Sequence, residues 1–314
     1  MPFLHELEDF SDLIAVVADD LQIDPSLVEK DYWIMHALWG LQQLGFRFEL
    51  KGGTSLSKGY QLIHRFSEDI DILIHPDERL PIGKNHDKPA HVERRSAFFD
   101  GLVPRMVIPG FDRAERDHAF DDPAGRMRGA GIRLIYPALN PLPDGVKAGV
   151  LLEAGFDRVA PNRPRLITSW AYEHAVSASV ADLNDNRAVD VPCYEPGYTF
   201  VEKLQTVSTK FRQQQDSGEM PTNFLRHYYD LYCLLDDPDV QAFIGTPDYL
   251  AHKADRFRGA DEPDLSRNEA FRLGDAPTRG LYADAYARTR ALYYQHQPSL
   301  DEILKRLEPW LGRL

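Results

Sequence analysis

The stretch KGGTSLSKGYQLIHRFSEDIDILI, residues 51–74, places two glycines and several hydroxyl residues ahead of three carboxylates and an apolar run. Its last part predicts a buried strand over residues 69–74. Successive side chains of a strand point to opposite faces, so Asp69 and Asp71 would share one face, about 7 Å apart, while Ile70, Ile72 and Ile74 face the core. Two carboxylates would then border one site.

Two carboxylates held close together repel each other, and a divalent cation between them removes this repulsion. Mg²⁺, or Mn²⁺ in its place, suits hard carboxylate oxygens and keeps coordination positions open for phosphate. Glu153, within the apolar run VLLEAGF, is our candidate for a third metal-binding carboxylate, because a buried charge needs a partner or an ion. The alternative for Glu153 is an ion pair with Arg133 or Arg158.

The glycine pair predicts a second part of the same site. Gly52 and Gly53 allow the backbone to approach a polyphosphate, and the N–H groups that open the next helix at Thr54 and Ser55 favour an anion. The spacing between Gly53 and Lys58 does not match a Walker A loop. The alternative interpretation is a simple helix N-cap at Thr54.

The rest of the chain predicts an α+β protein. Asp24-Pro25 starts a helix of about twenty residues that ends at Gly45. Further predicted elements are a strand at 46–50, a short helix from Thr54 toward Tyr60, a loop at 76–91, a helix at 92–107 interrupted near Pro104, and two strands at 131–139 and 146–156. The turn sequence NPLPDG (140–145) favours an antiparallel hairpin between these two strands.

After residue 196 the pattern becomes helical, as in 198–211 and 223–235. We therefore expect two domains, a β-rich one at 1–195 and a helical one at 196–314. The chain has 43% apolar residues, which is typical of a globular protein, and no window suits a membrane span or a signal peptide. We expect a cytoplasmic protein. Cys193 and Cys233 lack metal-site spacing and are interpreted as core residues.

The net charge of −13 argues against broad non-specific binding to nucleic acid. Between Lys84 and Arg133, however, ten Lys and Arg residues stand against eight Asp and Glu. This segment is either a solvated mixed-charge surface or a local nucleic-acid contact. Two of its three histidines, His86 and His91, lie in a proline-containing loop, and no His/Asp metal cluster is seen, so a phosphohydrolase is disfavoured.

Several motifs together resemble the AbiEii/AbiGii-type toxins, nucleotidyltransferases of the DNA polymerase β superfamily found in type IV toxin-antitoxin and abortive-infection systems. The resemblance runs, in order, through VEKDYW (28–33), KGGTSLSKGY (51–60), RFSEDIDILI (65–74), VEKL (201–204) and YYDLYCLL (228–235). It implies a polymerase-β-like mixed sheet with flanking helices, followed by a mainly helical C-terminal domain.

The resemblance also implies roles for single residues. Asp69 and Asp71 match the aspartates that bind metal and position the triphosphate, Ser67 matches a serine near the nucleotide, and Gly53 and Thr54 match the phosphate-binding turn. Lys203 and Asp230 match a lysine and an aspartate of the helical half. Their alternatives are a lysine that runs along the core edge to solvent and an ion pair between Asp230 and Arg226.

The predicted site therefore has two overlapping sets. The catalytic set is Asp69, Asp71, Glu153, Lys203 and Asp230, with the metal on Asp69, Asp71 and Glu153. The nucleotide-binding set is Gly52, Gly53, Thr54, Ser55, Lys58, Ser67 and Lys203.

The function implied by the resemblance is Mg²⁺-dependent transfer of a nucleoside monophosphate from an NTP to an acceptor, tRNA or another RNA, with release of pyrophosphate. The protein would be a toxin with a cognate antitoxin encoded nearby. The alternative is a catalytically inactive module of the same fold that binds a nucleotide or a partner.

Overall fold

The computed structural model of the protein describes residues 1–76, 79–83, 85–143, 146–156, 160–257 and 259–314. Contacts divide the chain into two compact units. The first unit consists of Met1–Tyr60 and Phe66–Tyr194, and the second of Gln61–Arg65 and Glu195–Leu314. The short segment Gln61–Arg65 therefore belongs to the second unit, although both of its neighbours along the chain belong to the first.

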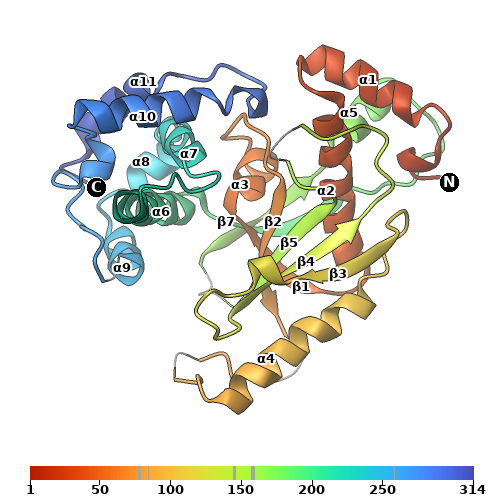
Figure 1. The fold of residues 1–314 in the computed structure, drawn as a ribbon. Coiled ribbons are helices and arrows are strands. Elements are labelled where there is room, and N and C mark those ends of the chain that lie inside the picture. Colours follow the sequence, from red (N-terminus) through yellow and green to blue (C-terminus); the bar gives the residue numbers. More distant parts are fainter. Residues whose placement is uncertain (77–78, 84, 144–145, 157–159, 258) are drawn as a thin grey trace. The chain divides into compact units, whose positions relative to one another are not determined.

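The first unit is built on one mixed sheet of seven strands in the order β3-β4-β5-β2-β1-β7-β6 (Figure 1). The strands are β1 Arg47–Lys51, β2 Asp69–His75, β3 Arg113–Asp117, β4 Gly129–Ile135, β5 Val150–Gly155, β6 Asn162–Ile167 and β7 Ala188–Tyr194. Strand β2 runs antiparallel to β1 and parallel to β5. Strands β4 and β5 pair antiparallel, which confirms the predicted hairpin pairing.

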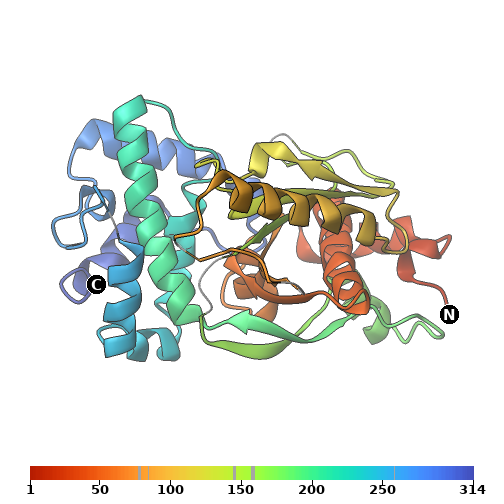
Figure 2. The ribbon, with the colours of Figure 1, turned by 90° about the horizontal axis from the view of Figure 1, so that it is seen from below.

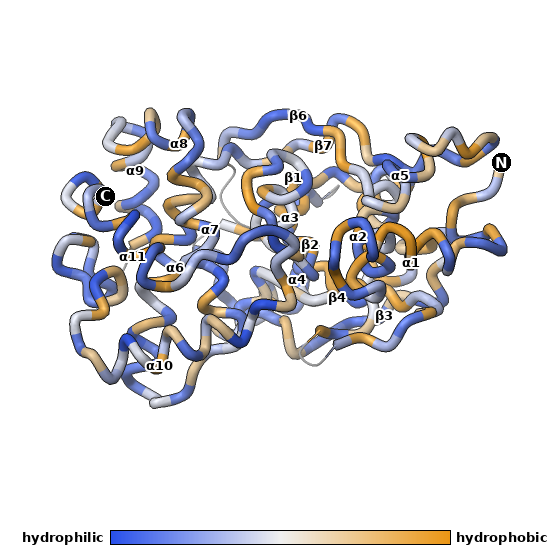
Figure 3. Tube along the Cα trace, turned by 90° about the horizontal axis from the view of Figure 1, so that it is seen from above, coloured by the Kyte–Doolittle hydropathy of each residue, from blue (hydrophilic) through white to orange (hydrophobic). Residues whose placement is uncertain are grey.

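The helices of this unit are α1 Phe10–Leu21, α2 Pro25–Gln43, α3 Gly52–Thr54, α4 Pro89–Leu102 and α5 Trp170–Ser177. Helix α2 begins as predicted: the Asp24 carboxylate accepts a hydrogen bond from the Ser26 N–H (2.9 Å), and Pro25 takes the first helical position. The helix is buried on nearly all sides, because it contacts the sheet, α1 and α5. Figure 3 shows α1 and α2 next to each other, with hydrophobic residues on both.

The core of the first unit lies between α2 and one face of the sheet. Ile70, Ile72 and Ile74 are almost completely buried, which confirms the predicted core face of β2. On the same face Tyr136, just beyond β4, stacks on Trp33 of α2, with ring centroids 5.0 Å apart. The acidic residues of β2 take the opposite face by strand alternation.

The two edges of the sheet carry residues that oppose further strand pairing. Strand β3 has the sequence RAERD, which is charged at all but one position, and β6 has the sequence NRPRLI and is mostly exposed. Pro164 of β6 has no N–H to donate to a neighbouring strand. Charged and proline-containing edges are a common protection against the addition of another chain.

The structure corrects one part of the predicted element map and adds to it. Helix α4 begins at Pro89, inside the segment 76–91 that was expected to be a loop, because proline is favourable at the first helical position. This helix ends at Leu102, just before Pro104, as expected. Helices α1 and α5 and strands β3, β6 and β7 have no counterpart among the elements predicted for the first unit. Asp144 and Gly145 of the predicted turn lie outside the described residues.

The second unit is helical in the residues that the structure describes. Its helices are α6 Pro196–Ser217, α7 Arg226–Leu234, α8 Pro238–Phe243, α9 Pro247–Arg256, α10 Ala276–Ala287 and α11 Leu300–Leu307 (Figure 2 shows the unit from below). Phe200, Leu204 and Val207 of α6 are fully buried. Among the described residues, no helix combines the length and apolar character that crossing a membrane requires.

The capping of α2 gives a first testable prediction. Asp24→Ala removes the carboxylate that accepts the Ser26 N–H and should lower the free energy of unfolding by about 1 kcal/mol. Asp20→Ala, at an exposed position of α1, is the control and should change it by less than about 0.5 kcal/mol. Urea denaturation followed by circular dichroism measures both. Equal effects of the two substitutions would contradict a stabilising cap.

Candidate active site

The two aspartates of β2 lie at the start of that strand and face away from the core. Asp69 is buried, with 8% of its surface exposed, and Asp71 is half-buried. Glu68, immediately before the strand, is also buried, and Ser67 before it is half-buried. Three carboxylates are thus placed within four residues at one end of a strand.

Glu153 lies beside Asp71 on the neighbouring strand. The parallel register of β2 and β5 pairs these two residues, so their side chains leave the same face of the sheet from backbones about 4.8 Å apart. On the other side, β1 pairs Lys51 with Asp71. Lys51, Asp71 and Glu153 therefore form one row across three adjacent strands.

The proposed alternative partners of Glu153 have different positions. Arg133 donates from Nε to the Asp117 carboxylate (2.9 Å) and forms an ion pair with it. Arg158 lies outside the described residues. Glu153 itself is half-buried in an otherwise buried strand, as the run VLLEAGF predicts.

The glycine turn packs directly against Asp71. Gly52 has a φ of +72°, and a Cβ on it would lie 2.1 Å from Oδ2 of Asp71, so both backbone and space require glycine here. The Thr54 hydroxyl donates to the main-chain oxygen of Asp69 (2.6 Å) and does not cap the helix. After the single turn of α3, residues Ser55–Gly59 continue as a π-helix. The structure thus brings Gly52, Thr54, Asp69, Asp71 and Glu153 together.

Helix α2 anchors the loops around these residues through buried charges. The Glu29 carboxylate accepts hydrogen bonds from the N–H groups of Leu139 (2.7 Å) and Asn140 (3.0 Å) and from the Asn140 side chain (2.9 Å). This carboxylate therefore fixes the loop between β4 and β5.

Lys30, the next residue of α2, reaches the start of β2. Its ammonium donates to the main-chain oxygen of Lys147 and lies 3.9 Å from Glu68 Oε2, which also accepts from the Lys147 N–H (3.3 Å). Burial lowers the pKa of Lys30 to about 8, although the charges of Glu68 and Asp69 act in the opposite direction. Lys30 is therefore a buried cation placed beside the acidic cluster.

Asp31, the third charged residue of α2, holds the π-helix that follows the glycine turn. Its carboxylate forms an ion pair with Lys58 (2.7 Å) and accepts from the Trp170 N–H (2.9 Å). The Lys58 ammonium also lies 3.9 Å from the centre of a Trp170 ring. Burial raises the pKa of Asp31, and the charge of Lys58 opposes this shift. Lys58, a predicted nucleotide-binding residue, is thus held within the protein by Asp31 and Trp170.

In the second unit, Asp230 binds both Lys203 and Arg65. The Asp230 carboxylate accepts two hydrogen bonds from Arg65 (2.6 and 2.7 Å), and the Lys203 ammonium lies 2.6 Å from it. Lys203 is only 6% exposed, so it does not run along the core edge to solvent. The segment with Arg65 is held further by a hydrogen bond from the His64 N–H to the Tyr229 hydroxyl (3.3 Å).

Burial and charge act in opposite directions on this cluster. Burial would raise the pKa of Asp230, but the charges of Arg65 and Lys203 outweigh it and lower the pKa well below its usual value. Burial lowers the pKa of Lys203, and Asp230 opposes this shift. Burial, together with the charge of Lys203, lowers the pKa of the neighbouring His227 and keeps that ring neutral at pH 7.

The donor chemistry of the first unit fits a hard cation, since Asp69, Asp71 and Glu153 are carboxylates on one face of the sheet. An open pocket of about 320 Å³ adjoins Asp71 and Glu153. Within the described ranges, however, no group of three or more His, Cys, Asp or Glu side chains is placed to hold a metal ion. A three-carboxylate Mg²⁺ site therefore stays a prediction.

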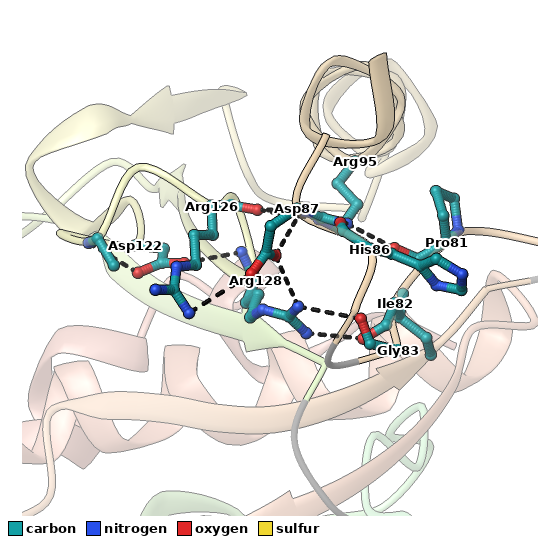
Figure 4. A network of polar contacts seen from close by, with 10 residues as sticks. Pro81, Ile82, Gly83, His86, Asp87, Arg95, Asp122, Arg126 and Arg128 are labelled. Carbon is teal, nitrogen blue, oxygen red and sulfur yellow. Dashed lines mark hydrogen bonds and ion pairs between the residues drawn. The ribbon is translucent and has the colours of Figure 1, made fainter. Parts of the chain in front are cut away.

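The positively charged segment between residues 84 and 133 is largely occupied by internal contacts. Lys84 lies outside the described residues. Ion pairs with aspartates or glutamates are made by Arg95, Arg113, Arg116, Arg126, Arg128 and Arg133. Figure 4 shows the centre of this network, where Arg95, Arg126 and Arg128 surround Asp87. Arg95 and Arg128 also donate hydrogen bonds to main-chain oxygens. Much of the predicted landing surface for RNA thus serves to hold loops together.

Sequence reasoning did not assign roles to the charged residues of α2 or to Arg65. All lie inside motifs that carry the family resemblance, at 28–33 and 65–74. These four charged residues stand among apolar ones in the sequence. Buried charges need partners, so such a pattern indicates that they pair with distant parts of the chain. Their partners, at positions such as 139–140 and 230, are visible only in the structure.

A comparison with protein-family models covers the motifs that follow residue 33, among them the one at 65–74. The model described as "Nucleotidyl transferase AbiEii toxin, Type IV TA system" matches residues 33–306. Neither a curated protein nor a solved structure matches the chain.

Gly52 gives a prediction with a matched control. Gly45 has nearly the same backbone angle, φ +75°, but nothing within 4 Å of an added Cβ. Gly45→Ala should therefore lower the free energy of unfolding only by the backbone strain, about 1 kcal/mol. Gly52→Ala should cost about 1–3 kcal/mol more, because the methyl group displaces the Asp71 carboxylate. Urea denaturation measures the difference, and equal losses would rule out the close packing of Gly52 on Asp71.

Asp230 gives a prediction for stability and its pH dependence. Asp230→Asn leaves two buried cations without their carboxylate and should destabilise the protein by about 3–5 kcal/mol at pH 7. The folded pKa is lowered, so this contribution is present above the unfolded pKa of about 3.9 and is lost as the pH falls through the folded pKa. Thermal melting curves should show a constant difference in stability between the two proteins from pH 7 to pH 5, and this difference should begin to shrink only below about pH 4.

The control for this experiment is Asp236→Asn, which removes an ion pair between Asp236 and Arg306 in which the carboxylate is 64% exposed. It should cost less than about 1 kcal/mol. If Asp230→Asn were no more damaging than this control, the buried cluster would not stabilise the second unit.

Proposed function

The chain belongs to the AbiEii family of nucleotidyl transferase toxins of type IV toxin-antitoxin systems, and on this premise we propose that it transfers a nucleoside monophosphate from an NTP to an RNA acceptor. The observation that carries the proposal is the contact of the Gly52 turn with Asp71, next to Glu153. A turn suited to phosphate and a pair of carboxylates are thereby placed side by side. As a toxin of this class, the protein has a cognate antitoxin.

The roles within the first unit follow from position. The main-chain N–H groups of Gly53, Thr54 and Ser55 bind the triphosphate, since consecutive N–H groups at the start of a helical turn favour an anion. Ser67, ahead of the acidic residues, lies near the nucleotide. Lys58 acts indirectly, by fixing the π-helix through Asp31. Lys203 and Asp230 remain predicted catalytic residues of the second unit, where Asp230 faces two cations.

Asp69, Asp71 and Glu153 would hold Mg²⁺ or Mn²⁺. When bound, the cation supplies positive charge that polarises the phosphate and offsets the charge developed during transfer. The chain's own contribution is to orient the NTP and the acceptor for an in-line displacement. An acceptor hydroxyl oxygen bonds to the α-phosphorus, the bond to pyrophosphate breaks, and the hydroxyl proton passes to solvent. We place this reaction in the cytoplasm, where NTPs and RNA occur together.

The experiment is a transfer assay with purified protein, Mg²⁺, each α-³²P-labelled NTP in turn and total cellular RNA. The wild-type protein should label RNA. Asp69→Asn and Asp71→Asn should each reduce labelling by about 100-fold or more, as does the loss of one charge-stabilising group in an active site. Asp112→Asn, at an exposed position ahead of β3, should retain full activity.

Calorimetric titration of NTP with and without Mg²⁺ completes the test. NTP binding by the wild-type protein without any transfer would identify a catalytically inactive module in place of an enzyme. Transfer that persists in both aspartate variants would place the active site elsewhere.

A further inference from the structure

A pocket on the acidic side of the sheet has a role that the triphosphate site does not explain. It has a volume of about 320 Å³, at the lower end of the range for small-ligand pockets, about 300–1,000 Å³. It is lined by acidic, basic, aromatic and small residues: Lys51, Asp71, Ile72, Phe120, Arg128, Gly129, Ala130, Glu153, Ala154, Gly155 and Phe156. The space suits a single nucleotide, not a duplex.

The floor of the pocket is open because two glycines face each other. Gly129 of β4 and Gly155 of β5 are register partners. Neither has a positive φ, and a Cβ on either would make only ordinary contacts, the nearest at 3.6 and 3.4 Å. The backbone therefore does not require glycine at these two positions. What the glycines provide is room on the face that carries Glu153.

Phe120 forms an aromatic wall beside this floor. It is the last residue of the short 3-10 helix His118–Phe120. The Cβ of Phe120 packs on Gly131, where an added Cβ would lie only 2.7 Å from it. Gly131 is the register partner of Glu153, so the ring stands next to that carboxylate. The Lys147 ammonium lies 3.9 Å from the ring centre. Phe120 is thus held in place before any ligand binds.

The order of strands places most of this pocket to one side of the phosphate turn. The row Lys51, Asp71 and Glu153 follows the order β1, β2, β5, with Gly131 of β4 next. The glycine turn follows β1, and the pocket begins at Lys51 and Asp71 and extends away from the turn over β5 and β4. In an in-line transfer the attacking and leaving oxygens lie on opposite sides of the phosphorus. With the triphosphate on the turn, the acceptor enters from the side of the pocket.

We propose that this pocket binds the terminal nucleotide of the RNA acceptor, with its base stacked on Phe120 and its hydroxyl directed toward Asp71 and Glu153. The proposal rests on the proposed function. Aromatic stacking accepts any base, because every base has a π face. Lys51 and Arg128 are the basic residues of the lining, and Arg128 is already held by an ion pair with Asp87 (2.8 Å).

The test uses three substitutions in the full-length protein. Phe120→Ala removes the ring, Phe120→Tyr keeps a stacking surface, and Gly155→Val fills the floor with a side chain that strands favour. Leu166→Ala, at an exposed position of the edge strand β6, is the matched apolar control. Thermal melting of each variant identifies any that is unfolded.

Two measurements are made on each protein. Fluorescence polarisation with a 5′-labelled single-stranded RNA pentamer reports acceptor binding, and calorimetry with a non-hydrolysable NTP reports nucleotide binding. Phe120→Ala and Gly155→Val should weaken RNA binding by about 10-fold or more, the size of a lost base-stacking contact. Phe120→Tyr and Leu166→Ala should bind RNA like the wild type, and NTP affinity should not change in any variant.

Three results would overturn the proposal. The first is unchanged RNA binding by both Phe120→Ala and Gly155→Val. The second is a loss of NTP affinity in place of RNA affinity. The third, from the transfer assay, is label on protein side chains in a protein that does not bind the pentamer. The RNA measurement needs no catalysis. A wild-type protein that binds the pentamer through Phe120 but transfers nothing would therefore contradict the proposed function and leave the pocket assignment intact.

Discussion

The first unit depends on the pairing of three consecutive buried charges on α2. Successive residues of a helix point about 100° apart, so Glu29, Lys30 and Asp31 reach three different segments. Each charge has a specific partner, in the loop at 139–140, at Glu68 and Lys147, and at Lys58. A buried charge that loses its partner costs several kcal/mol, so these segments are fixed relative to the helix. The glycine turn and the start of β2 owe their positions to this arrangement.

Local patterns were sufficient to predict the parts of the fold that repeat within a few residues. The alternation in residues 69–74 gave the two faces of β2, and Asp24-Pro25 gave the start of α2. Glu153 stood out as an acid in an apolar run, and the register of β2 with β5 places it beside Asp71. The edge strand β3 was missed because its residues are nearly all charged and show no apolar alternation. The same limit applies to Phe120, which lies near Glu153 only through the order of the strands.

The second unit shows a different use of buried charge. Arg65 precedes the acidic residues in sequence, yet its guanidinium binds Asp230 of α7 in the second unit. The chain therefore passes from the glycine turn into the second unit and back before it forms β2. No short-range pattern predicts such a path, because the residues that pair are 165 positions apart. The sequence showed only that Arg65 opens a motif and that Asp230 lies among apolar residues.

The composition of the edge strands has a consequence for engineering this protein. Strands β3 and β6 shield β4 and β7, whose inner faces carry apolar residues such as Ile132 and Val191. An internal deletion that removes either edge strand would expose the neighbouring apolar strand with unsatisfied backbone groups. Such a strand pairs readily with the same strand of another molecule, so shortened forms would self-associate into insoluble material.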